Sequence, residues 1–163
     1  MIELVEQPRS SNLCGQACVA MLAGVTLDEA IKVVGTRGKT TSLQLGRGLA
    51  ELGHILCGCV LIRGNPEKIE SSEPILVRTH YFSRYTGKEL THWVVVHREF
   101  MFCPTVGLTP LHDLSVWVKK NPISWFTSFH HVREMTSIER MRYRETGTWM
   151  HPLDDGSGEP CGI

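Results

Sequence analysis

The spacing of apolar residues changes near residue 54, and this change constrains the fold more than any other feature of the chain. Before it, apolar side chains recur at helical spacing in segments that end in glycine. After it, short runs rich in β-branched and aromatic residues are separated by polar connections. Helices followed by strands, rather than the two in alternation, predict an α+β domain.

Three helices are predicted before this change, over residues 13–23, 26–35 and 41–53. The second and third begin with the capping-box pattern, a threonine followed three residues later by Glu or Gln: Thr26 with Glu29, and Thr41 with Gln44. A basic loop, Gly35-Thr-Arg-Gly-Lys-Thr40, separates them. Although it contains Gly-Lys-Thr before a helix, it lacks the spacing and the preceding strand of a phosphate-binding loop.

Five strands are predicted after the change, at 55–62, 74–82, 92–96, 100–103 and 123–132. Thr109 and Pro110 predict the start of another helix, with proline at its first position, that contains Leu114 and Trp117. Residues 144–163 are rich in Gly, Pro and charge and are predicted to form a polar tail. The domain itself is therefore expected to cover residues 1–143.

Charge and cysteine usage exclude several classes of function. The 17 basic and 17 acidic residues balance, so no net field draws the chain to nucleic acid or to a membrane. No apolar run approaches the roughly 20 residues that span a bilayer. The N-terminus lacks the features of a secretory signal, so a cytoplasmic location, in the producing cell or in a host, is expected. The six cysteines have no regular spacing, which predicts neither a disulfide framework nor a metal site.

Cys14 stands where a polar turn meets the first predicted helix. Unpaired backbone N–H groups and the helix dipole favour an anion at this position, and the thiolate is the reactive form of cysteine. Gly15 follows and is expected to leave room for a substrate near the sulfur. The alternative is a buried structural thiol, which is how we interpret Cys18 one turn further along.

His92 opens a strand that continues into three valines. His92 and His97 face opposite sides of this strand because their positions differ by an odd number. The face of His92 also carries Val94 and Val96, so we predict that this face packs in the core beside the first helix. His97 is expected near a turn, in solvent, which makes His92 the better candidate for a general base.

These segments resemble the papain-like cysteine peptidases and, within them, the C39-like peptidases. The resemblance rests on Gln7, on Cys14-Gly-Gln-Ala17 with Met21, and on His92-Trp-Val-Val-Val96. It implies a papain-like fold, in which N-terminal helices, with the nucleophile at a helix start, pack on a C-terminal antiparallel sheet. It also implies that Cys14 is the nucleophile, His92 the general base and Gln7 part of the oxyanion hole, with no cofactor. The alternative for Gln7 is a surface glutamine before a proline turn.

The third catalytic position departs from the family. Relatives usually carry aspartate before the proline that follows this hairpin, and here that position is Cys103. A tight hairpin would place Cys103 diagonally across from His92, on the same face and within reach of its ring. A thiol accepts only weak hydrogen bonds. Three possibilities follow: a Cys14–His92 dyad, a carboxylate supplied from elsewhere, such as Asp113, or a domain that has lost activity.

The residues therefore predict a cysteine-dependent hydrolase that cleaves a peptide or other amide bond through a thioester acyl-enzyme. Two alternatives stay open: a glutamine deamidase or acyltransferase that uses the same pair, and an inactive papain-like binding module. C39-like domains in bacterial exporters cleave after double glycine and are fused to membrane segments. The sequence contains no such segment, so we expect a stand-alone bacterial or phage protein with a protein or peptide substrate.

Overall fold

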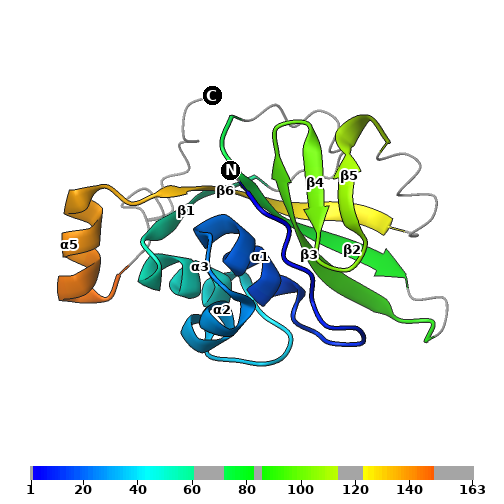
Figure 1. Cartoon of the computed structure of the whole chain (residues 1–163), viewed down its shortest axis with the longest axis horizontal. Coiled ribbons are helices and arrows are strands. Elements are labelled where there is room, and N and C mark those ends of the chain that lie inside the picture. Colours follow the sequence, from blue (N-terminus) through cyan, green and yellow to red (C-terminus); the bar gives the residue numbers. More distant parts are fainter. Residues whose placement is uncertain (1, 61–71, 83–85, 114–122, 149–163) are drawn as a thin grey trace.

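The computed structural model describes residues 2–60, 72–82, 86–113 and 123–148 of the 163-residue chain. Three helices come first: α1 (Cys14–Ala23), α2 (Leu27–Val34) and α3 (Ser42–Glu51). The described strands all follow them and form one sheet (Figure 1). The predicted α+β class is therefore confirmed.

Local signals account for the bounds of the helices. The Thr26 hydroxyl accepts a hydrogen bond from the Glu29 backbone N–H, and the Glu29 carboxylate accepts one from the Thr26 N–H. Thr41 and Gln44 make the same reciprocal pair at the start of α3. α1 and α2 end at Gly24 and Gly35, whose left-handed conformations stop the helix without strain.

The sheet contains β1 (His54–Val60), β2 (Ile75–Phe82), β3 (Glu89–His97), β4 (Phe100–Cys103), β5 (Gly107–Pro110) and β6 (Ile123–Glu134). Among the described strands the order is β1-β6-β2-β3-β4-β5, and every neighbouring pair is antiparallel. β3 and β4 form a tight hairpin in which Val96 pairs with Met101. This register is the one that places Cys103 on the same face as His92.

The predicted helix start at Thr109 and Pro110 is wrong. Both residues belong to β5, where Thr109 pairs with Met101 and Pro110 with Phe100. β5 ends the sheet in the described structure, and an edge strand tolerates a proline because one of its sides needs no N–H donor. A short 3-10 helix, η2 (Leu111–Asp113), follows. The rest of the predicted helix, from residue 114 on, lies outside the described residues.

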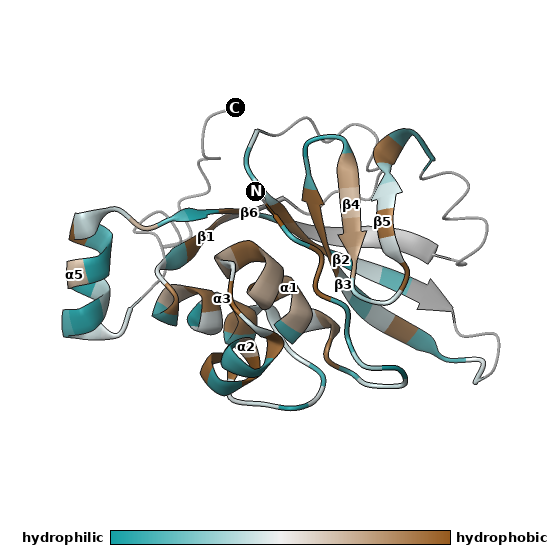
Figure 2. Cartoon of the chain, in the orientation of Figure 1, coloured by the Kyte–Doolittle hydropathy of each residue, from teal (hydrophilic) through white to brown (hydrophobic). Residues whose placement is uncertain are grey.

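Apolar side chains are buried on both faces of the sheet. On one face, helices α1 to α3 pack against strand residues that include Trp93 and Val95. On the other face, β2, β3 and β4 contribute a second cluster: Ile75, Val77, Val94, Val96, Met101 and Cys103. Figure 2 shows the apolar character of α1, which packs on β3.

The prediction that Val94 and Val96 face the helices is therefore wrong. Alternation along β3 was assigned correctly, since Trp93 and Val95 share one face and the two valines share the other. Both faces are buried, however, so hydrophobicity alone could not indicate which of them the helices cover. His92 shares the face of the two valines, which the helices do not cover.

A further helix, α5 (Ser137–Thr146), was not predicted (Figure 1). It begins with a capping box between Thr136 and Glu139, and Arg133 binds the Glu139 carboxylate through both terminal nitrogens at 2.7 and 2.9 Å. The capping-box pattern was the signal that could have revealed it. α5 ends beyond residue 143, where the domain was predicted to end. No helix in the described part of the chain is both long and apolar enough to cross a membrane.

Candidate active site

Cys14 is the first residue of α1 and is half-buried. Its own backbone N–H and that of Gly15 lower the pKa of the thiol, as expected at a helix start. Burial has the larger effect, however, and the net pKa of Cys14 is raised. The thiolate expected from helix position alone is therefore not the resting form at neutral pH.

The Cys14 sulfur also meets β3. Among the groups that lower its pKa, the backbone N–H of Trp93 has the largest effect. Trp93 follows His92 directly, so Cys14 lies beside the strand segment that carries the candidate base. The structure thus brings Cys14 and His92 into one neighbourhood, although they are far apart in sequence.

His92 contacts Cys103. Its Nε2 lies 3.2 Å from the sulfur of Cys103, which leaves Nδ1 as the ring nitrogen available to a nucleophile. Burial lowers the pKa of His92 to about 4. The ring is therefore neutral at pH 7 and able to accept a proton. Burial is the single cause of this shift, so no charge in the described structure stabilises the imidazolium.

Several hydrogen-bond donors surround the sulfur of Cys103. The backbone N–H groups of Thr105 and Val106 lower the pKa of its thiol, although burial raises the net value. If His92 is to accept a proton at Nδ1, its Nε2 must carry hydrogen and donate to the Cys103 sulfur. The two N–H groups and the imidazole thus surround a position suited to an acceptor or an anion. Cys103 can orient the ring from there, but an uncharged thiol does not stabilise its protonated form.

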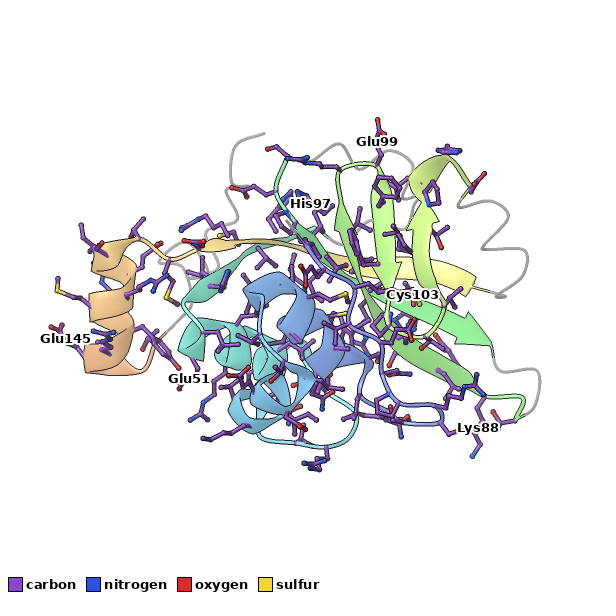
Figure 3. The ribbon with its side chains drawn as sticks, in the orientation of Figure 1. Glu51, Lys88, His97, Glu99, Cys103 and Glu145 are labelled. Atoms are coloured by element: carbon purple, nitrogen blue, oxygen red, sulfur yellow. The ribbon has the colours of Figure 1, made fainter. Side chains whose placement is uncertain are left out.

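Asp113 does not occupy the third position. It lies in η2, where its carboxylate is 3.7 Å from Nε2 of His112, and both side chains are largely exposed. His97 lies at the other end of the β3–β4 hairpin from Cys103 (Figure 3). Among the candidates considered, the described structure places only Cys103 at the ring of His92.

Gln7 is hydrogen-bonded to the turn after Cys103, which supplies two of these donors. Its backbone N–H donates to the Pro104 carbonyl and its Nε2 donates to the Thr105 hydroxyl, both at 2.9 Å. Its Oε1 is buried and has no hydrogen-bond partner among the residues that the structure describes. These contacts tie the partly exposed Gln7 to the turn that follows Cys103. The amide nitrogen carries a second hydrogen, which an oxyanion could accept.

Gly15 does not leave room for a substrate, contrary to expectation. A Cβ atom at this position would clash with Oγ1 of Thr40. The glycine is therefore required by the close approach of the loop between α2 and α3. No sequence pattern indicates this contact. The backbone donors from Trp93, Thr105 and Val106 are equally hidden, because a backbone N–H is the same at every non-proline position.

The depressed pKa of His92 predicts how stability depends on pH. In the unfolded chain His92 gains a proton near its ordinary pKa of 6.5, whereas in the folded protein it gains one only near pH 4. The unfolded state therefore binds more protons between these values, and stability falls as the pH is lowered from about 6.5 to about 4. We expect Tm to fall more steeply over this interval in the wild type than in His92→Gln. Parallel slopes in thermal unfolding would contradict the burial of a neutral His92.

No protein-family profile matches the sequence, and no curated protein matches it either. The fold is similar to that of a double glycine motif protease from an AMS/PCAT transporter, whose crystal structure was determined in complex with the leader peptide. The TM-score is 0.50 and the sequence identity is 17%, over 80% of this chain and 92% of that chain. At this identity the likeness shows the fold alone, and it agrees with the expected papain-like arrangement.

Proposed function

We propose that the protein is a cysteine-dependent hydrolase that cleaves a peptide or other amide bond through a thioester acyl-enzyme. The observation that carries the proposal is the meeting of Cys14, at the first turn of α1, with the segment of β3 that holds His92. His92 has one ring nitrogen directed to Cys103 and the other available. A nucleophile at a helix start beside an oriented, neutral imidazole is the arrangement that acyl transfer requires.

The pKa directions indicate the order of proton transfer. Burial favours the thiol form of Cys14 and the neutral form of His92, so a separated thiolate and imidazolium are not the resting state. In the proposed reaction His92 takes the thiol proton as the sulfur attacks the carbonyl carbon, and it then gives this proton to the leaving amine. The backbone N–H of Cys14 and the amide of Gln7 are the proposed donors to the oxyanion.

Exposure distinguishes Cys14 from Cys103 as the nucleophile. Cys103 is the cysteine seen in contact with His92, but none of its surface is exposed, so a substrate carbonyl cannot reach it. Cys14 is half-buried and is partly open to solvent. We therefore assign attack to Cys14 and ring orientation to Cys103.

The proposed substrate is a peptide or protein segment. The structurally similar protease was crystallised with a peptide, which supports this class of substrate but not a particular sequence. An inactive binding module is the main competing proposal, because an uncharged Cys103 stands where relatives carry an acid. Both proposals can be tested by the chemistry of Cys14 before a natural substrate is known.

We expect brief treatment with iodoacetamide at pH 7 to modify Cys14 well before Cys18 and Cys103. Those two thiols have no exposed surface, whereas Cys14 is partly exposed and lies beside the strand segment that carries His92. In His92→Ala the rate at Cys14 should fall by roughly tenfold or more, since no imidazole then accepts the proton. Peptide mapping by mass spectrometry measures both rates. An unchanged rate in His92→Ala would support the binding module.

A further inference from the structure

We propose that residues 36–40 act as a brace between the nucleophile and the base, and that Gln16, which holds this brace, is a positioning residue. The brace is the loop that links α2 to α3. The inference rests on the proposed hydrolase function. It assigns a role to Gln16, which takes no part in the proposed chemistry.

Gln16 anchors the brace to α1. The side chain has no exposed surface, and its Nε2 donates to the carbonyls of Thr36 at 2.8 Å and Gly38 at 3.0 Å. A buried amide is costly unless it is hydrogen-bonded, and a buried carbonyl that loses its donor is costly as well. An apolar residue at position 16 would therefore leave two loop carbonyls without these bonds. Gln16 stands two residues after Cys14.

The same loop contacts the residues that follow each catalytic group. Thr40 fills the space above Gly15, directly after Cys14. The carbonyl of Thr40 also accepts a hydrogen bond from the indole Nε1 of Trp93, directly after His92, at 3.5 Å. This bond is long, but the Trp93 side chain is only 2% exposed and is held in the core between helices and sheet.

These contacts form a closed path from α1 through the loop to β3. The backbone N–H of Trp93 in turn acts on the Cys14 sulfur, so Trp93 meets the loop through its side chain and the nucleophile through its main chain. If the loop detaches from Gln16, both Thr40 contacts lose their support. The separation of Cys14 and His92 would then vary, and a displacement of about 1 Å can lower a rate by roughly a hundredfold.

Gln16→Met is the variant that tests the brace, because it keeps the length of the side chain and removes both donors. Gln44→Met is the matched control. Gln44 also bonds to backbone, accepting from the Thr41 N–H at 2.9 Å, but it caps α3 and does not hold residues 36–40. Each variant is measured by hydrogen exchange of peptides that cover residues 13–18 and 91–96, and by kcat and KM on a reactive acyl ester.

In Gln16→Met we expect faster exchange in both catalytic segments and a fall in kcat of roughly tenfold to a hundredfold at nearly constant KM. In Gln44→Met, faster exchange should be confined to the start of α3. Faster exchange limited to residues 36–40, with kcat no lower than in the control, would overturn the brace. If Gln16→Met exchanges faster in both catalytic segments but the wild type shows no turnover, the brace stands and the hydrolase proposal fails. Should Gln16→Met not fold, Trp93→Phe removes the indole donor alone and should change exchange in residues 13–18 in the same direction.

Discussion

His92→Ala is expected to lower kcat on a reactive acyl ester by roughly a hundredfold to ten-thousandfold, the range that general-base catalysis contributes. The neutral ring, whose pKa burial lowers to about 4, is the proton acceptor in the proposed reaction. Steady-state hydrolysis of an aryl ester, followed by release of the phenol, measures this loss. KM should change little, since the ring acts on the thiol proton rather than on binding.

His97→Ala is the matched control for this prediction. His97 lies on the same strand but at the other end of the hairpin from Cys103, next to the turn (Figure 3). Its removal should leave kcat near the wild-type value. Equal losses from both substitutions would show that the assignment of the base to His92 is wrong, provided that both variants keep the wild-type Tm.

Cys103→Asp is expected to keep the fold and to raise activity by roughly tenfold or more, because loss of a carboxylate from this role in a triad costs far more than that. The new carboxylate would meet the N–H groups of Thr105 and Val106 and the His92 ring, which now contact the sulfur. It should also raise the pKa of His92 above its present value of about 4, since a nearby anion stabilises the imidazolium. Ester hydrolysis and NMR titration of the ring measure the two effects.

Cys103→Ser is the control, because it keeps the size and the neutrality of the side chain and should leave the His92 pKa near its wild-type value. A buried carboxylate without adequate partners costs several kcal/mol, so the two variants distinguish the possible roles. Gross destabilisation by aspartate, with serine tolerated, would mean that Cys103 is an ordinary core residue of β4. The third catalytic group would then have to be sought elsewhere.

Local patterns predicted the first three helices and the β3–β4 hairpin well, because their causes are local. The capping boxes at Thr26 and Thr41 operate within four residues, and the hairpin register follows from a two-residue turn. The same register brought Cys103 to His92, which is why that contact could be expected. β5 was missed because Pro110 fits both a helix start and an edge strand, and only its pairing with Phe100 decides between them.

The features that could not be predicted depend on segments that meet only in the folded chain. Gly15 was interpreted as open space for a substrate, but the loop between α2 and α3 brings Thr40 onto it. The pKa of Cys14 was expected to be low from its helix position, but packing against β3 buries the thiol enough to raise it. Periodicity also could not indicate which buried face of β3 the helices cover.

The most direct test of the proposed chemistry is to trap the acyl-enzyme. The protein is mixed with an aryl ester, quenched in acid within the first turnover, and analysed by intact mass and peptide mapping. We predict one added acyl group on Cys14 in the wild type, where the thiol is half-buried beside β3, and none in Cys14→Ala. Product release without acylation of Cys14, or equal acylation in the Cys14→Ala variant, would contradict the assignment of Cys14 as the nucleophile.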